Sequence, residues 1–305
     1  MLLPSIFLNT NMTAFIDIIL SGVFHAAVLF LLAGGLQLVF GVQKIVNLAC
    51  GAFYALGAYF GITLVTNAMK YGMPSYSLII ILIVAGLLIG LVGPFIERLL
   101  RLVYAREEGF QLLLTFAIML LLEDLMRMIW GATPMTLGNL SMTYGQINFA
   151  STSIPTYKIL VIGASIILAL GLGWMLQKTD FGRIVRATAE NRRMSEAMGV
   201  NVVWINVVIF TMGAMLGTIG GALVVPTAAA SLEMISEVVV EAFAVVVIGG
   251  LGSMRGALVG ALIVGIMRAF AVSIYAEIDL LLIYLIVIGI LIFKPAGLFG
   301  KAVES

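Results

Sequence analysis

Residues 35–60 read GLQLVFGVQKIVNLACGAFYALGAYF, and in this stretch a short polar break separates two apolar runs. The break contains Gln43, Lys44 and Asn47. Apolar runs separated by short polar breaks recur along the rest of the chain. Of its 305 residues, 62% are hydrophobic and only 10% are charged. The mean hydropathy is +1.19. A soluble domain of this length exposes much more polar surface, so the sequence predicts an integral membrane protein.

The apolar runs are long enough to cross a bilayer, whose core of about 30 Å requires about 20 residues per helix. They lie at residues 15–40, 49–66, 77–96, 110–130, 157–176, 203–225, 238–250, 256–274 and 279–293. The run at 238–250 is short, and the pattern leaves open whether it spans or re-enters. The first run follows a stretch without Lys or Arg, so we expect a retained span rather than a signal peptide. We predict an all-α fold, a polytopic bundle of about eight or nine spans with broken helices.

The distribution of Lys and Arg indicates the orientation, because these residues concentrate in cytoplasmic loops. An external N-terminus places twelve of the sixteen inside. These twelve are Lys44, Arg98, Arg101, Arg106, Lys178, Arg183, Arg186, Arg192, Arg193, Arg255, Lys294 and Lys301. The loop at 131–156 has no Lys or Arg, which suits an external position. We therefore expect the N-terminus outside and the C-terminus inside.

Composition also excludes several classes of function. A net charge of +1 gives no electrostatic footprint for nucleic acid. Cys50 and His25 are the only residues of their types, which excludes multi-cysteine and multi-histidine metal clusters. The chain has no phosphate-binding nucleotide loop and no nucleophile paired with a base. We expect no enzyme activity, metal or cofactor in this chain, so an ion gradient or another polypeptide must supply energy.

One polar segment, FGRIVRATAENRRMSEAMGVN at Phe181–Asn201, carries charges at helical spacing. One face of the predicted amphipathic helix holds Ile184, Ala187, Asn191, Met194 and Met198, and another holds Arg183, Arg186, Glu190 and Arg193. Asp180 is expected to cap its start, and Gly199 to end it in a left-handed conformation. Two interpretations remain open: a solvated connector held by Arg on anionic lipid, or a docking helix for a soluble partner.

Four stretches, in chain order, resemble one family, the LivH-like permeases of branched-chain amino-acid ABC importers. Residues 35–60 resemble its first-span signature, and GRIVRATAENRRMSEAMGVN at 182–201 resembles its cytoplasmic coupling loop. AFAVVVIGGLGSMRGALVGALIVGI at 242–266 resembles its Gly-Gly-x-Gly-Ser element, and FKPAGLFGK at 293–301 its C-terminal tail. Four ordered matches are more specific than any one of them.

The resemblance implies a single transmembrane permease domain over 1–305, with a coupling loop at 178–201, in a bacterial inner membrane. It implies a second permease subunit, two ATP-binding subunits that hold ATP and Mg, and a periplasmic solute-binding protein. Glu196-Ala197-Met198-Gly199 matches the element that seats in the ATPase. The residues expected to couple to it are Arg183, Arg186, Glu190, Arg193, Met194, Glu196, Ala197, Met198 and Gly199.

Two irregular regions are candidates for the solute pathway, because transporters often place it at paired helix breaks. The residues expected to line it are Asn47, Cys50, Gly51, Tyr54, Gly249, Gly250 and Gly252. The alternative is that both regions are ordinary cytoplasmic turns. Cys50 stands where the family has His and Leu48 where it has Phe, which bears on the cargo more than on the fold. With Cys50 in place of His and a largely apolar path, we expect a branched-chain or other hydrophobic amino acid as the cargo.

Charges inside the apolar segments are functional candidates. Glu123, Asp124 and Arg127 have the spacing for mutual neutralisation, with a proton relay as the alternative. Glu241 and Arg268 either pair with each other or reach separate interfaces. His25 is expected to hydrogen-bond within the bundle, and Cys50 to be a buried small residue. Glycines four residues apart, such as Gly57 and Gly61 or Gly213, Gly217 and Gly221, indicate close helix packing.

Two other classes of protein compete with the importer permease. An ion-coupled secondary transporter requires acidic residues at mid-membrane, whereas the acids here lie near span ends. It also leaves the helix at 181–199 without a partner. A channel or structural subunit gives the four family stretches no reason to occur together. The cargo, and whether the two permeases are identical, stay undetermined by sequence.

Overall fold

The structure is a computed structural model that describes residues 3–104, 106–149, 152–274, 279–294 and 297–300. Its helices are α1 (Leu3–Gln43), α2 (Cys50–Lys70), α3 (Leu78–Gly90), α4 (Gly93–Leu100), α5 (Glu108–Trp130), α6 (Thr156–Lys178), α7 (Asp180–Glu190), α8 (Arg192–Ala197), α9 (Val202–Val224), α10 (Met234–Gly249), α11 (Met254–Ile274) and α12 (Asp279–Phe293). Short 3₁₀ helices are η1 (Ser75–Ser77), η2 (Arg101–Val103) and η3 (Gly138–Tyr144).

Each of the nine predicted apolar segments is mainly helical, which confirms the helical fold class. The one exception to an all-helical fold among the described residues is a small antiparallel hairpin of β1 (Gln146–Phe149) and β2 (Thr152–Pro155). Six helical stretches of the described chain are long and apolar enough to cross a membrane: Phe15–Gln43, Cys50–Lys70, Ser75–Val103, Thr156–Lys178, Val202–Val224 and Met254–Ile274. The count of eight or nine spans and the orientation stay predictions.

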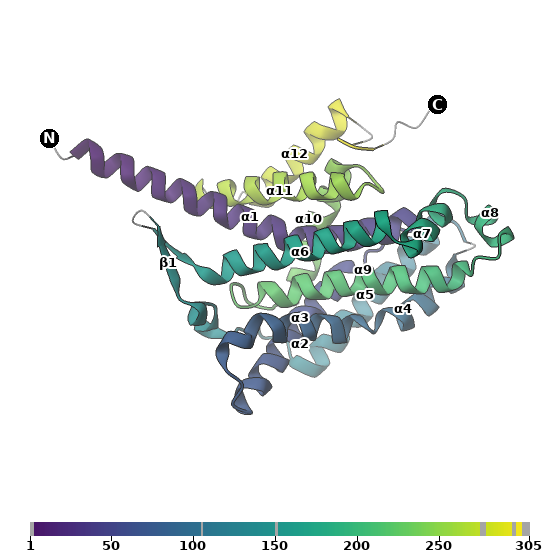
Figure 1. Ribbon diagram of the computed structural model, residues 1–305, viewed down its shortest axis with the longest axis horizontal. Helices are drawn as coiled ribbons and strands as arrows, with labels where there is room; N and C mark the ends of the chain where they lie inside the picture. Colours follow the sequence, from purple (N-terminus) through teal and green to yellow (C-terminus); the bar gives the residue numbers. More distant parts are fainter. Residues whose placement is uncertain (1–2, 105, 150–151, 275–278, 295–296, 301–305) are drawn as a thin grey trace.

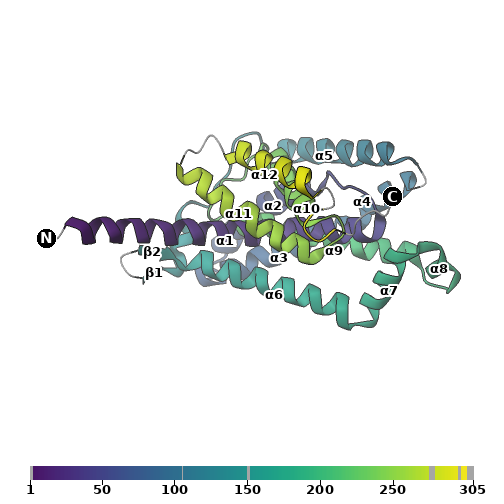
Figure 2. The same cartoon turned by 90° about the horizontal axis from the view of Figure 1, so that it is seen from above.

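The long helices run along one common direction, with α1 extending the full length of the bundle (Figure 1). The start of α1 and the β1–β2 hairpin lie at one end. The helix pair α7 and α8 projects at the opposite end, beyond most of the other helices (Figure 2). The two ends of the molecule therefore carry different structures, a β-hairpin at one end and a pair of short helices at the other.

Helix α9 forms the centre of the bundle and packs against α1, α2, α3 and α4. Glycine makes this packing close, as the spacing of four predicted. A Cβ on Gly57 of α2 would overlap the carbonyl of Thr218 in α9, and a Cβ on Gly221 would overlap the carbonyl of Tyr54. The backbones of α2 and α9 are therefore in direct contact, which larger residues would prevent.

Two helices differ from the predicted boundaries. The segment at 77–96 was expected to be continuous, but α3 ends at Gly90 and α4 begins at Gly93. Pro94 lies in the first turn of α4 and has no N–H to donate to the preceding turn, so the helix breaks there.

The short segment at 238–250 is α10, whose 16 residues measure about 24 Å at 1.5 Å per residue. It packs against α1, α2, α11 and α12.

Candidate functional site

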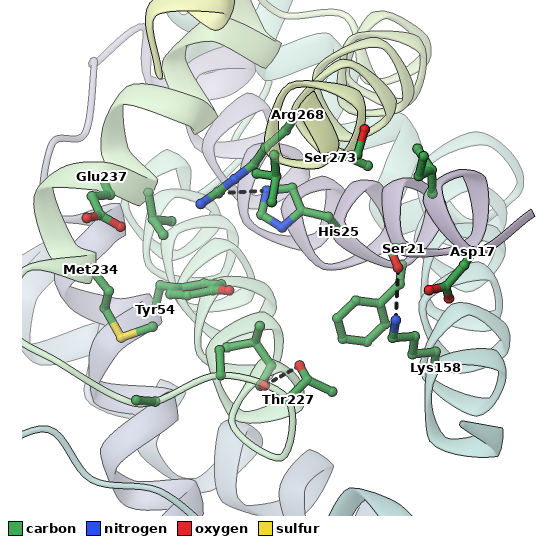
Figure 3. A pocket seen from close by; sticks show the side chains of 18 of the residues that line it. Asp17, Ser21, His25, Tyr54, Lys158, Thr227, Met234, Glu237, Arg268 and Ser273 are labelled. Carbon is green, nitrogen blue, oxygen red and sulfur yellow. Dashed lines mark hydrogen bonds between the residues drawn. The ribbon is translucent and has the colours of Figure 1, made fainter. Parts of the chain in front are cut away.

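A pocket of about 540 Å³ lies near the end of the bundle that holds the β1–β2 hairpin, and we call it the vestibule. Its walls come from α1, α2, α6, α10, α11 and the connection between α9 and α10. The polar and charged side chains that line it are Asp17, Ser21, His25, Tyr54, Lys158, Thr227, Ser231, Glu237, Arg268 and Ser273. Figure 3 shows these groups arranged around the cavity, with Lys158 donating to Ser21 at 2.9 Å.

A cluster of three ionisable side chains adjoins the vestibule, and two of them, His25 and Arg268, line it. His25 Nε2 lies 2.8 Å from Glu241 Oε2 and 3.1 Å from Arg268 Nη1. Arg268 Nη1 also donates to Glu241 Oε1. Glu241 and Arg268 therefore pair with each other, which decides between the two alternatives left by the sequence. His25 is a hydrogen-bonding residue of the bundle, as predicted.

The three side chains of this cluster differ in their exposure to solvent. The Glu241 side chain is fully buried, whereas those of His25 and Arg268 are 24% and 25% exposed. A buried carboxylate is costly unless a cation and hydrogen bonds compensate it, and Arg268 and His25 supply both. Glu241 lies well inside α10 and not near a helix end, so the expectation that the acids lie near span ends is wrong for this residue.

The first predicted break is the connection between α1 and α2. Its backbone folds into the protein: Asn47 is buried, and its side-chain oxygen accepts from the Ala49 N–H at 3.1 Å. Thr115 of α5 donates to the Val46 carbonyl at 3.4 Å. Irregular backbone among apolar helices requires such partners. The connection is therefore largely buried, although Lys44 at its start is exposed.

The second predicted break joins α10 to α11. Gly250 and Gly252 have φ of +92° and +82°, in the left-handed region that glycine tolerates. Gln37 of α1 fastens this turn, because its amide donates to the Gly250 carbonyl at 2.9 Å and accepts from the Gly252 N–H at 2.5 Å. The C-terminal tail closes the other side, with Leu298 donating to the Ile248 carbonyl at 2.8 Å.

The predicted pathway residues do not share one surface. Tyr54 lines the vestibule, whereas Asn47 and Cys50 line a separate enclosed space of about 10 Å³ with Gly35, Gly213 and Gly217. Gly51 packs against the Ile235 carbonyl of α10, and Gly249 packs against Gly256 of α11. Sequence analysis did not place His25 and Arg268 in a pocket, and it did not single out Gln37. Gln37 could have been noticed as a polar residue within an apolar run.

The predicted coupling segment consists of two helices and not one. The chain breaks at Asn191, whose φ and ψ are −146° and 94°. Its side chain accepts from the Met194 N–H at 3.0 Å and so caps α8. Thr179, and not Asp180, caps α7, because its hydroxyl accepts from the Gly182 N–H at 3.1 Å. Asp180 instead pairs with Arg183.

The end of α8 follows the prediction. Gly199 has φ of +86°, and its N–H donates to the Glu196 carbonyl at 3.0 Å. The Val200 N–H donates to the Ser195 carbonyl at the same distance, which completes a Schellman motif. The helix therefore stops sharply after Met198 and turns back toward α9.

The outer surface of α7 and α8 is apolar at several positions. Met194 and Met198 are 61% and 78% exposed, and Ile184 is 38% exposed, whereas Val185 and Ser195 face the protein. The predicted coupling residues on this surface are exposed: Arg183, Arg186, Glu190, Arg193, Met194, Glu196, Ala197, Met198 and Gly199. Glu196 pairs with Arg192 at 3.1 Å and Arg186 donates to the Leu176 carbonyl, so these two are anchored locally.

A buried polar network lies near the coupling segment. Glu97 is fully buried and pairs with Arg101 at 2.5 Å. The Tyr104 hydroxyl donates to Glu97 at 3.1 Å and approaches Gln43 at 3.3 Å. Burial and the Glu97 carboxylate raise the pKa of Tyr104 well above its usual range, so the hydroxyl stays protonated.

The structure also bears on the alternatives left open for the charged residues of α5. Arg127 donates to Glu123 at 2.9 Å and to Asp124 at 3.2 Å, which is the mutual neutralisation expected from their spacing. Glu123 and Arg127 also line a pocket of about 430 Å³ between α5 and the start of α10. Within the part of the chain that the structure describes, no group of three or more His, Cys, Asp or Glu is placed to hold a metal ion.

Among the described residues, six apolar helical stretches of membrane-crossing length indicate a multi-pass membrane protein, with a polar vestibule at one end and an exposed helix pair at the other. The particular family follows from comparison with known proteins. Residues 18–291 match the family described as "Branched-chain amino acid transport system / permease component", and the chain belongs to this family.

Several known permeases are similar to this chain over most of their length. The branched-chain amino acid permease protein BraD of Pseudomonas aeruginosa is 26% identical, with 89% of this chain and 91% of the relative covered. LivH of Escherichia coli K12, with the same description, is 25% identical over 94% and 96% of the two chains. The ribose import permease protein RbsC of Haemophilus influenzae is 25% identical over 83% and 76%. Permeases for amino acids and for a sugar are therefore both similar to this chain.

Proposed function

We propose that the chain is the transmembrane permease subunit of an ATP-binding-cassette importer and forms the pathway for a small amino acid. Its partners would be a second permease, two ATP-binding subunits and a periplasmic solute-binding protein, in a bacterial inner membrane. The observation that carries the proposal is the exposed pair of Met194 and Met198 on a projecting helix, in a chain of this permease family. A helix with apolar anchors is suited to a groove in a soluble subunit.

In this arrangement the vestibule end faces outward and the α7–α8 end faces the cytoplasm. The ATP-binding subunits would hold ATP and Mg, and nucleotide binding would bring them together and move α8. The Schellman turn at Gly199 connects α8 to α9, the central helix of the bundle. A displacement of α8 therefore acts directly on the packing around the pathway. ATP supplies the difference in free energy between the two states.

The cargo we propose is a branched-chain or other hydrophobic amino acid. Both BraD and LivH are described as branched-chain amino acid permeases, and the resemblance extends over most of this chain. The wall of the vestibule includes Phe24, Met234, Val238 and Val272, which suit an apolar side chain. The polar groups around them suit the backbone charges of an amino acid.

An ion-coupled secondary transporter remains the second candidate, because Glu241 is a fully buried acid next to His25. Such a pair is typical of proton relays in transporters. The pairing of Glu241 with Arg268 argues for a fixed structural charge instead, because a proton carrier must be able to lose its counter-charge.

The proposal is tested by uncoupling. A double variant, Glu196→Ala with Gly199→Ala, alters both the charge and the turn of α8 without touching the vestibule. We expect this chain to insert and assemble normally, while ATP-driven uptake of L-leucine into proteoliposomes falls by about tenfold or more. Tyr71→Ala, at an exposed position after α2, is the control. Uptake that survives unchanged in the double variant contradicts the proposal.

A further inference from the structure

A second cavity, of about 470 Å³, lies over α1 toward the α7–α8 end of the bundle, and we call it the basal groove. Figure 2 shows α1 between α11 and α6, and both of these helices pack against it. The groove is lined by α1, by α6 with α7, and by the start of α11 with the turn before it. None of its described lining residues also lines the vestibule.

The basal groove is open and not filled by side chains. A Cβ added to Gly41 of α1, Gly173 of α6 or Gly252 of the α10–α11 turn would meet nothing within 4 Å. Leu170 of α6 and Leu258 of α11, which also line the groove, are both exposed. Exposed apolar surface on membrane-crossing helices faces lipid, so the groove is accessible from the bilayer.

The groove changes from apolar to polar along its length. Its apolar residues include Phe30 and Leu38, which lie inside a helical stretch long enough to cross a membrane. Gln177 and Arg255 lie one residue from the ends of two other such stretches, and Arg186 lies beyond them in α7. The groove therefore extends from the hydrocarbon core to the bilayer surface.

Two arginines make the surface end of the groove positive. Arg186 and Arg255 are both exposed, and none of the described residues that line the groove is acidic. Arg186 is held in place because its Nη1 donates to the Leu176 carbonyl near the end of α6. This contact uses one nitrogen of a guanidinium that has five N–H donors in a planar fork, a shape that suits phosphate oxygens. The charge therefore matches an anion at the depth where lipid phosphates lie.

We propose that the basal groove binds an anionic phospholipid, with its phosphate on Arg186 and Arg255 and an acyl chain against Phe30 and Leu38. Basic pockets between membrane helices at the bilayer surface typically hold anionic lipid head groups. A soluble anion would leave the apolar part of the groove unfilled. The inference goes beyond the proposed transport function and does not depend on it. A bound lipid would connect α7, which leads to the docking helix α8, with the start of α11.

The inference is tested by native mass spectrometry of the chain, purified in detergent with the subunits that accompany it. Dioleoyl phosphatidylglycerol and dioleoyl phosphatidylcholine are supplied in equal amounts, and we expect the chain to retain phosphatidylglycerol in preference. Arg186→Gln and Arg255→Gln should each reduce this preference by about fivefold, because each removes a positive charge near the phosphate. Arg98→Gln, at an exposed position of α4 outside the groove, is the matched control and should keep the preference.

A second pair of variants tests the shape of the groove without changing its charge. Gly173→Leu fills the apolar part and should abolish the preference for phosphatidylglycerol. Gly163→Leu lies on the same helix, where an added Cβ also meets open space, but it does not line the groove and should bind lipid like the wild-type chain. Because both positions are open, we expect both variants to fold, which thermal unfolding checks.

Other occupants of the groove give different results. Phosphatidylglycerol should raise the melting temperature of the chain and glycerol 3-phosphate should not; equal stabilisation by both would identify a site for a soluble anion and overturn the inference. Loss of a second permease, and not of lipid, from the Gly173→Leu variant would identify a contact between subunits and also overturn it. Equal retention of the two lipids by the wild type, or an equal effect of Arg98→Gln and Arg255→Gln, would do the same.

Discussion

Glu241 lies in the middle of α10, where its charge requires compensation. It is fully buried, and only its contacts with His25 and Arg268 make its charge tolerable. Glu241→Leu removes the carboxylate and leaves Arg268 without its main counter-charge. We expect this variant to lower the free energy of unfolding by about 3–5 kcal/mol, because removing one partner of a largely buried ion pair takes away the interaction that offset the desolvation of the other. Thermal unfolding in nanodiscs measures the loss.

The matched control is the double variant Glu241→Leu with Arg268→Leu. Replacing both partners by apolar residues removes the unpaired charge, so much of the lost stability should return. If the single and double variants are equally unstable, the pair does not act as a unit and the description of the cluster is wrong.

Gly57 makes a second prediction at the scale of one residue. A Cβ at this position would overlap the Thr218 carbonyl, so Gly57→Ala must push α2 away from α9. We expect a loss of about 1–3 kcal/mol in stability or a failure to accumulate in the membrane. Gly163→Ala in α6 is the control, because nothing lies within 4 Å of an added Cβ there. Equal stability of the two variants would contradict the close contact.

At the scale of elements, the sequence predicted where helices lie better than where they break. Gly199 was identifiable as a helix end, because glycine is the residue that adopts the left-handed conformation without strain. Asn191 was not identifiable as a break, since its spacing also fits the face of a continuous helix. Its capping role depends on the turn of the chain, which local pattern does not specify. Pro94 also indicates a helix break, but it lies inside an apolar run long enough to be taken as one continuous span.

Helix α8 is predicted to bind the ATP-binding subunit through its exposed methionines. Met194→Asp with Met198→Asp should abolish co-purification of that subunit, because charges replace the apolar anchors. The thermal stability of the chain should be unchanged, since neither side chain packs within the bundle. Met73→Asp, which alters a similarly exposed methionine in the connection after α2, should retain the subunit. Retention of the ATPase by the α8 variant would contradict the docking role.

At the scale of the whole molecule, hydropathy alone predicted the nine helical segments, whereas the contacts between them required the structure. Gln37 binds the turn at Gly250 and Gly252 across more than two hundred residues of sequence. Nothing in the spacing of a single sequence identifies such a partner. For the same reason the pairing of Glu241 with Arg268 was only one of two alternatives, and His25 was not predicted to join it.

The orientation of the molecule gives a prediction that cysteine labelling can check. The native Cys50 is buried and should not react with a membrane-impermeant maleimide. Thr143→Cys, in the predicted external loop, should be labelled in intact cells. Ala197→Cys, in α8, should be labelled only after the membrane is permeabilised. Labelling of Ala197→Cys in intact cells would show that α8 lies outside the cytoplasm. It would contradict both the predicted orientation and the docking of an ATPase on α8.

The most direct measurement is affinity purification of the tagged chain from its native membrane in mild detergent, followed by mass spectrometry of the proteins that accompany it. The account predicts recovery of an ATP-binding subunit and a second permease. A chain recovered alone, which still moves L-leucine into proteoliposomes without ATP, would contradict the importer proposal and favour the ion-coupled alternative.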